Sequence, residues 1–342
     1  MFLNFAEDDE RIFFMLFQEP IMVEMQKKTG KITKSRVISN ERGRAGLFSQ
    51  IYLIQEKIMC IPWNSNFFSV YDLKKDELRV IDIPEKELKK QSYGLFRTAI
   101  QNKQTLYAFG VNYHGVVRIN LEEEKAECIA NLADLGRGFI DENVVLNQKV
   151  YIPLAESSKI AIFDLETEEL TYVELKVKNK SSIRTICYDG NSFWISFSDN
   201  SVIKTDVSFI QTAEINHLSD TLKNFKKVKN SAYFDNSIFF FPEESENVIK
   251  YNRIDQTIEL IDIENINSII DLYYANIVNN YLLLYSEMRD QVYSYCQNSK
   301  KFMIFKEQPS GNEYLKVLLE NNFLTKEKDS NSLINFINTV SE

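Results

Sequence analysis

The chain has 342 residues, of which 44% are apolar and 26% are charged, a composition typical of a folded globular protein and not of a disordered one. It carries 40 Lys and Arg residues against 49 Asp and Glu residues, a formal net charge of −9. This acidic balance argues against a general nucleic-acid binder or a protein that binds anionic membranes, while leaving room for a local basic patch. The cysteines lie far apart and form no CxxC pair, so we interpret them as buried thiols of a reducing compartment: Cys60, Cys128, Cys187 and Cys296.

The first residues, MFLNFAEDDERIFF, are acidic where a secretory signal peptide needs a basic region followed by an unbroken apolar stretch. No apolar run approaches the roughly 20 residues that a membrane-spanning helix needs. We therefore expect a soluble, cytoplasmic protein without a membrane span.

The same order of elements recurs along the chain: an apolar strand, a polar loop, an alternating strand, a short charged turn and another strand. A short run rich in Ile, Val, Tyr and Phe precedes each copy and predicts a further strand, so that each unit has four. A weaker first copy, RIFFMLFQEPIMVEMQKKTGKITKSRVI, is followed by six clearer ones: KIMCIPWNSNFFSVYDLKKDELRVIDI, QTLYAFGVNYHGVVRINLEEEKAECIANL, QKVYIPLAESSKIAIFDLETEELTYVEL, NSFWISFSDNSVIKTDVSFIQTAEI, NSIFFFPEESENVIKYNRIDQTIELIDI and NYLLLYSEMRDQVYSYCQNSKKFMIF.

One position of the repeat measures its period. The residue that follows the last apolar position of the alternating strand recurs every 42 to 48 residues: Met25, Asp72, Asn120, Asp164, Asp206, Asn252 and, less clearly, Tyr295. The average of about 45 residues is the length of one four-stranded propeller blade. We therefore predict an all-β fold, a β-propeller over residues 1–308, with seven four-stranded blades and not six or eight. Because glycine is scarce, Asp and Asn at this position are expected to stabilise the neighbouring turns.

Two other folds compete with the propeller. A parallel βαβ fold needs helical periods between its strands, and none is present before residue 309. A β-helix has shorter rungs, of roughly 20 to 25 residues, and no hairpin turns inside its unit. Both are therefore disfavoured.

Residues 309–342 follow a different pattern, with helical spacing of apolar residues in NEYLKVLLENN and NSLINFINTV. Neither predicted helix is long enough to be stable alone in water, so each must dock on something. We expect a helical C-terminal tail that packs on the rim of the propeller or, alternatively, binds a partner or a second copy of the chain.

Two segments carry a resemblance to known proteins: YIPLAESSKIAIFDLETEELTYVEL (Tyr151 to Leu175) and CIPWNSNFFSVYDLKKDELRVIDI (Cys60 to Ile83). Their order of strand, Pro, polar loop, strand and turn resembles the seven-bladed propellers of the broad kelch-like, NHL-like and quinoprotein-like group. The double glycine of kelch blades and the Trp-Asp ending of WD-type blades are missing, so no subfamily is assigned. The resemblance implies a binding scaffold for most members and a lyase, hydrolase or oxidoreductase for a minority.

In a propeller, the loops between the second and third strands and the loops between blades share the face on which ligands usually bind. The loops between blades are basic here and supply Arg44, Arg97, Arg137, Arg184, Lys227 and Lys229. Arg97 and Arg184 fall at the same place, twelve residues before the end of the second strand. Either these side chains converge on an anion at the channel mouth, for which Arg offers bidentate donors, or each pairs with a neighbouring blade and closes the ring.

The other loop set contains Trp63 and Tyr113, which are expected to stack on a sugar ring or a peptide side chain, although Trp63 could instead pack between blades. It also contains His114, a weak candidate for a general base. No His, Cys or Asp cluster has metal-ligand spacing, and no GxSxG, GxGxxG or phosphate-binding glycine loop is present. We expect no metal and no cofactor.

The favoured function is a non-enzymatic binding scaffold that recognises a protein partner or an anionic or saccharide ligand at the channel mouth, with no nucleic-acid partner. The alternative is a lyase or hydrolase acting on an acidic saccharide or peptide at the same face. It would use His114 or a pair of carboxylates, with support from the arginines.

Overall fold

The computed structural model describes residues 5–15, 20–26, 31–41, 46–91, 93–175, 181–210, 212–225, 227–243, 245–264, 273–278, 281–286 and 291–304. The predicted helices of the tail, residues 309–342, lie outside these ranges. Strands dominate the described chain, and its helical elements are short: η1 (Lys86–Leu88), η2 (Ala133–Leu135) and α1 (Asn216–Leu222). Within the described residues, no helix is long and apolar enough to cross a membrane.

The strands form seven consecutive antiparallel groups of four. The first three are β1 (Phe5–Glu7), β2 (Arg11–Met15), β3 (Ile21–Gln26) and β4 (Ile32–Val37); β5 (Phe48–Ile54), β6 (Lys57–Pro62), β7 (Phe67–Asp72) and β8 (Glu77–Asp82); and β9 (Phe96–Asn102), β10 (Thr105–Gly110), β11 (Gly115–Asn120) and β12 (Lys125–Asn131).

The next two groups are β13 (Val144–Leu146), β14 (Lys149–Pro153), β15 (Lys159–Asp164) and β16 (Leu170–Glu174); and β17 (Ile183–Tyr188), β18 (Phe193–Phe197), β19 (Val202–Thr205) and β20 (Thr212–Glu214). The last two are β21 (Val228–Phe234), β22 (Ser237–Pro242), β23 (Asn247–Asn252) and β24 (Ile258–Ile263); and β25 (Tyr273–Val278), β26 (Tyr281–Ser286), β27 (Gln291–Cys296) and β28 (Lys301–Ile304).

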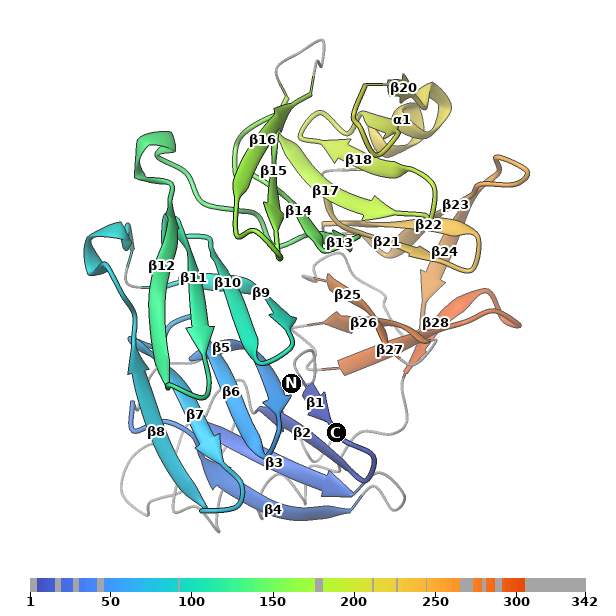
Figure 1. Ribbon diagram of the computed structural model, residues 1–342. Coiled ribbons are helices and arrows are strands. Elements are labelled where there is room, and N and C mark those ends of the chain that lie inside the picture. Colours follow the sequence, from blue (N-terminus) through green and yellow to red (C-terminus); the bar gives the residue numbers. More distant parts are fainter. Residues whose placement is uncertain are drawn as a thin grey trace.

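The first five groups are separate four-stranded sheets, whereas the last two share one eight-stranded sheet. They are joined by a short parallel pairing of β24 with β28, at Asp262 with Lys301 and at Ile263 with Phe302. The prediction of four-stranded antiparallel units is confirmed, and the architecture is all-β and consistent with a β-propeller (Figure 1).

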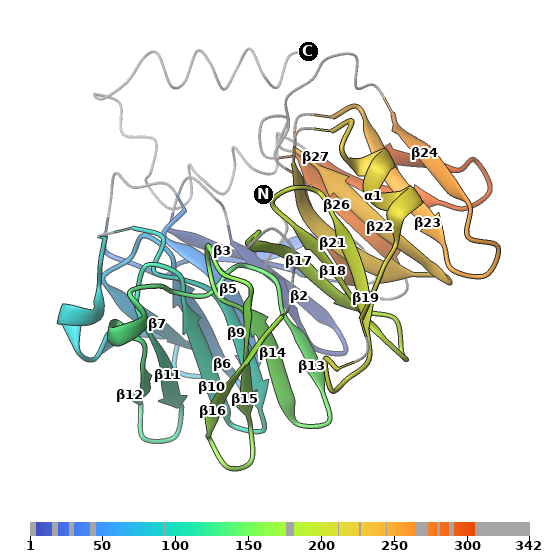
Figure 2. The same cartoon turned by 90° about the horizontal axis from the view of Figure 1, so that it is seen from above.

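The first strand of each group lies towards the centre of the arrangement (Figure 1). Accordingly, β1 contacts β5, β5 contacts β9, β17 contacts β21, and β21 contacts β25. The turns between β11 and β12, between β13 and β14 and between β15 and β16 lie along one edge in Figure 2. Because neighbouring strands are antiparallel, the loops between second and third strands and between groups lie at the opposite ends of the strands, as expected.

Burial falls from the inner strands to the outer ones. β22 (SIFFFP) is buried at every position, which explains its continuous apolar sequence. The outer strand β8 (ELRVID) is mostly exposed, and Ile81 is its one buried position. β22 is therefore covered on both faces, as expected for a strand of a sheet packed between two others.

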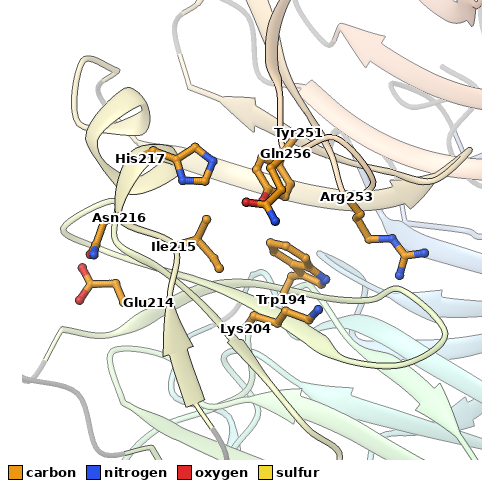
Figure 3. Close-up of a pocket in the computed structure, with 9 residues that line it drawn as sticks. All are labelled: Trp194, Lys204, Glu214, Ile215, Asn216, His217, Tyr251, Arg253 and Gln256. Atoms are coloured by element: carbon orange, nitrogen blue, oxygen red, sulfur yellow. The ribbon is translucent and has the colours of Figure 1, made fainter.

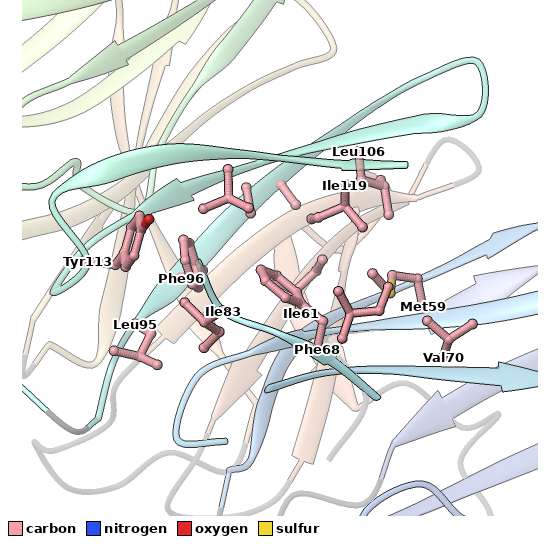
Figure 4. Close-up of a cluster of buried hydrophobic side chains, with 14 of the residues drawn as sticks. Met59, Ile61, Phe68, Val70, Ile83, Leu95, Phe96, Leu106, Tyr113 and Ile119 are labelled. Atoms are coloured by element: carbon pink, nitrogen blue, oxygen red, sulfur yellow. The ribbon is translucent and has the colours of Figure 1, made fainter. Parts of the chain in front are cut away.

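Six hydrophobic clusters among the described residues each lie between two successive groups of strands. In the cluster of Figure 4, Phe68 of β7 packs against Phe96 of β9 with ring centroids 5.5 Å apart, and Phe96 packs against Tyr113 at 4.9 Å. All three side chains are fully buried. Burying one such ring stabilises the fold by about 2–3 kcal/mol. Because each cluster takes side chains from two successive groups, this burial holds consecutive sheets together face to face.

The repeated Asp and Asn positions stabilise turns, as predicted. Asp72 Oδ1 accepts the N–H groups of Lys74 and Lys75, each at 3.0 Å. Asn120 and Asp164 bind the N–H groups two and three residues ahead in the same way. These carboxylate and amide side chains take the place of a backbone acceptor, so the turns form without glycine.

Candidate functional site

A β-bulge recurs near the start of four inner strands. The pairing of each inner strand with the second strand skips one residue: Ser49 in β5, Arg97 in β9, Arg184 in β17 and Lys229 in β21. A bulged residue has no partner in the ladder, and the bend redirects its side chain. The fold thus presents three basic side chains at corresponding places.

Each bulge lies near the start of its strand, at the end that follows the loop from the preceding group. The residue before each bulge is a buried apolar one: Phe48, Phe96, Ile183 and Val228. The next residue of the bulged strand pairs with the second strand, Thr98 with Phe109 and Thr185 with Ser196. The structure therefore places Arg97 and Arg184 at equivalent positions, as the spacing indicates.

Arg184 and Lys229 belong to neighbouring inner strands, and one carboxylate ties these strands together. Glu142, in the segment before β13, accepts the N–H of Ile186 in β17 at 2.8 Å and the N–H of Ser231 in β21 at 2.7 Å. These two amides stand two residues after the two bulges. The backbones that carry Arg184 and Lys229 are thus held side by side.

Glu142 is buried, and its partners are on the free edges of strands. The N–H groups of Ile186 and Ser231 point away from β18 and β22, because they bind the Glu142 carboxylate instead. Burial raises the pKa of Glu142 well above its ordinary value, and this effect outweighs the two N–H bonds, which lower it. The carboxyl group is a structural acceptor between the inner strands β17 and β21.

Gln50 performs the same role two groups earlier. Its Oε1 accepts the N–H of Ala99 in β9 at 2.7 Å, and the hydroxyl of Tyr52 donates to the carbonyl of Ala99. Ala99 lies two residues after the bulged Arg97, just as Ile186 lies two residues after Arg184 and Ser231 two residues after Lys229. Gln50 and Glu142 therefore bind one edge amide each in β9, β17 and β21, two residues after the bulged Arg97, Arg184 and Lys229.

Trp63, Arg97 and Asp141 come together from three successive groups. The guanidinium of Arg97 lies over the Trp63 ring, 5.0 Å from its centroid, and Arg97 Nε is 3.4 Å from Asp141 Oδ2. The Asp141 side chain is 41% exposed and that of Arg97 is 23% exposed. Trp63 is half-buried in the loop after β6. This arrangement combines a cation–π contact with a partly solvated ion pair and crosses the boundaries between sheets.

The remaining predicted arginines are in different surroundings. Arg137, after η2, donates to the carbonyl of Glu156 in the loop after β14. Arg184 is exposed and has no ion pair within the described part of the chain. Arg44 lies outside the described residues. Arg97 and Arg137 thus link neighbouring groups, whereas Arg184 is available to a ligand.

Tyr113 is not exposed at this face, contrary to expectation. Its side chain is fully buried between Phe96 and the preceding segment, and its hydroxyl donates to the carbonyl of Pro84 at 3.2 Å. Gly110 permits this fold of the loop, because a Cβ there would lie 1.7 Å from the Tyr113 carbonyl oxygen. Tyr113 therefore belongs to the core and leaves the candidate site.

His114 is also covered, with 8% of its surface exposed. Its backbone N–H donates to Leu88 of η1, and burial lowers the pKa of its imidazole, with a smaller effect from Lys90. A covered imidazole is poorly placed to act as a general base on a ligand that binds at the surface. Among the described residues, no group of three or more His, Cys, Asp and Glu side chains could hold a metal ion.

Sequence comparisons yield no match: no protein-family model and no curated protein matches the chain. Solved structures do match. The computationally designed protein Ika8 is 8% identical, with a TM-score of 0.58 over 87% of this chain and 84% of its own. BamB from Moraxella catarrhalis, a β-propeller, is 14% identical, with a TM-score of 0.54 over 82% of this chain and 79% of its own.

PorZ, a bacterial surface component of the type-IX secretion system of Porphyromonas gingivalis, is 9% identical, with a TM-score of 0.54. It aligns with 86% of this chain and 37% of its own. At such identities these likenesses show the fold alone. They agree with the strand topology in being consistent with a β-propeller.

Proposed function

We propose that the protein is a non-enzymatic binding scaffold that recognises an acidic segment of a protein partner at the mouth of a seven-bladed propeller. The observation that carries this proposal is the repeated β-bulge, which sets Arg97, Arg184 and Lys229 at equivalent places on inner strands. Seven blades are supported by the seven groups of strands and by the six clusters that join them in succession.

Anion recognition is favoured by the chemistry of the bulged residues. Arg184 is exposed and offers a planar fork of donors, which matches a carboxylate. Lys229 stands at the corresponding place on the next inner strand, where Glu142 fixes the spacing. The chain has a net charge of −9, so most of its surface repels an acidic ligand. A local positive site attracts such a ligand and directs it to one place.

A polypeptide fits this arrangement better than a single small anion. The basic side chains belong to three different groups of strands, and Asp141 already occupies one side of Arg97. A ligand with several carboxylates spaced along a chain reaches more than one of them at once, and each contact adds to the affinity. Trp63 supplies an adjoining aromatic surface for a neighbouring side chain.

Two further assignments belong to the proposal. The strand, Pro, loop and strand pattern supports the broad kelch-like, NHL-like and quinoprotein-like group. Cys60 and Cys187 are buried as predicted, whereas Cys128 and Cys296 are only half-buried. All four are free thiols, which supports a reducing, cytoplasmic location. The covered position of His114 favours binding without turnover.

The test uses the full chain and a fluorescein-labelled decaglutamate peptide, with binding followed by fluorescence anisotropy at low salt. The double variant Arg184→Met/Lys229→Met is expected to bind at least about tenfold more weakly, since each charge-assisted hydrogen bond is worth about 1.5 kcal/mol or more. The control is Lys74→Met, which removes an exposed charge from the turn between β7 and β8, at the opposite ends of the strands. Equal affinity in the double variant and the wild type, with both folded, overturns the proposal.

A further inference from the structure

A pocket of about 360 Å³ lies between the groups β17–β20 and β21–β24, away from the bulges (Figure 3). Trp194 of β18, Lys204 of β19 and Tyr251 of β23 line it, together with Ile215 and His217 at the start of α1. Its size is within the range of small-molecule sites in proteins.

The aromatic wall of the pocket is fixed in place. Trp194 and Tyr251 are almost fully buried, with ring centroids 5.3 Å apart. Trp194 Nε1 donates to Asp189 Oδ2 at 2.7 Å, and the same carboxylate forms an ion pair with Arg253 at 2.6 Å. The Asp189 side chain is fully buried, so these bonds orient the indole before any ligand arrives.

Among the described residues that line the pocket, one cation has no carboxylate partner. Lys204 Nζ lies 5.5 Å from the centroid of the Trp194 ring and forms no ion pair within the described part of the chain. Arg253, at the same end of the pocket, is already neutralised by Asp189 (Figure 3). The half-buried ammonium of Lys204 is thus the free cation beside the apolar wall.

The opposite end of the pocket is acidic. Glu214 and Asn216 lie on the far side of Ile215 from Lys204 (Figure 3). The His217 ring packs against Tyr251, with centroids 5.5 Å apart, and extends the aromatic surface towards that end. The charges therefore define a direction: an anionic group is attracted to the Lys204 end and repelled from the Glu214 end.

We infer that this pocket binds a small carboxylic acid with an aromatic or aliphatic body. The carboxylate pairs with Lys204, and the apolar body lies along Ile215 and the rings of Tyr251 and His217. This site is separate from the bulged strand ends, so it does not depend on the proposed function.

The test titrates the full chain by isothermal titration calorimetry with phenylacetate, 4-phenylbutyrate and octanoate, and with 4-phenylbutanamide as the uncharged analogue. At least one of the carboxylates is expected to bind saturably, and the amide at least about tenfold more weakly than 4-phenylbutyrate. Saturable binding of no carboxylate, or equal binding of the amide, overturns the inference.

Variants locate the site. Lys204→Met is expected to weaken carboxylate binding about tenfold, and Lys204→Arg to retain it, because the charge is kept. Lys223→Met is the control, since Lys223 is exposed at the C-terminal end of α1, does not line the pocket, and is paired with Asp220 at 2.9 Å. Unchanged binding in a folded Lys204→Met variant contradicts the assignment. The Arg184→Met/Lys229→Met variant is expected to bind the carboxylate normally, so failure of the proposed function and failure of this inference are distinguishable.

Discussion

Glu142 accepts the backbone N–H of Ser231 at 2.7 Å, although 89 residues separate the two along the chain. The same carboxyl group accepts the backbone N–H of Ile186 in β17 at 2.8 Å. An innermost strand has one edge without a neighbouring strand, and its buried amides need acceptors from elsewhere. One side chain meets this need for two strands and thereby fixes the spacing of Arg184 and Lys229.

Replacing Glu142 by Ala is expected to destabilise the protein by about 2–4 kcal/mol, because two buried N–H groups lose their acceptor and each costs about 1–3 kcal/mol. Glu142→Gln keeps one acceptor oxygen and is expected to cost less. Urea denaturation followed by circular dichroism measures both. A free energy of unfolding that is the same in Glu142→Ala as in the wild type would show that the carboxylate does not hold the strands.

The stability supplied by Glu142 depends on pH. Burial raises its pKa in the folded state above the unfolded value, so the folded state binds more protons between these two pKa values. The contribution of the group is complete below the unfolded pKa, near 4.5, and is lost as pH rises through the folded pKa. The stability advantage of the wild type over Glu142→Gln should therefore shrink from pH 5 to pH 8. An advantage that grows with pH contradicts the prediction.

Arg253→Met is expected to destabilise the protein by about 3 kcal/mol, because it leaves the fully buried Asp189 without its cation. Burial by itself raises the pKa of Asp189, but the bonds from Arg253 and Trp194 more than offset this and lower it. The acid range gives a second measurement. Stability due to Asp189 is present above its unfolded pKa and is lost as pH falls through the lowered folded pKa. Without Arg253 the folded pKa rises, so urea denaturation should show a smaller loss of stability from pH 5 to pH 3 in the variant than in the wild type, and an equal or larger loss contradicts the prediction.

Two glycine substitutions distinguish close packing from turn conformation. Gly110→Ala places a Cβ 1.7 Å from the Tyr113 carbonyl oxygen, so the loop must move, at a cost of about 2–4 kcal/mol. Gly136→Ala meets nothing within 4 Å and is strained only by its φ of +60°, which costs about 1–2 kcal/mol. Thermal denaturation of the two variants compares them. A larger loss of stability in Gly136→Ala than in Gly110→Ala would contradict the close packing of Gly110 against Tyr113.

The periodic features of the sequence predicted the periodic features of the fold. The spacing of Asp72, Asn120 and Asp164 located the turns, because an Asp or Asn side chain acts on amides only two or three residues away. The equivalent positions of Arg97 and Arg184 in their strands were also predicted from the spacing. The β-bulge at each position was not predicted.

Features that depend on distant segments escaped prediction. Tyr113 and His114 are in a polar loop, yet residues of the preceding segment, Pro84 and Leu88, bind and cover them. Nothing near Glu142 in the sequence marks it as important, since its partners are 44 and 89 residues away. The pocket beside Trp194 likewise forms between two groups of strands, and no local sequence motif predicts it.

The most direct test of the proposed function is a crystal structure of the full chain with decaglutamate. The account predicts peptide carboxylates within hydrogen-bonding distance of the Arg184 guanidinium and of Lys229 Nζ, with the peptide crossing the ends of β17 and β21. Peptide bound elsewhere, with Arg184 and Lys229 not in contact with it, would contradict the account.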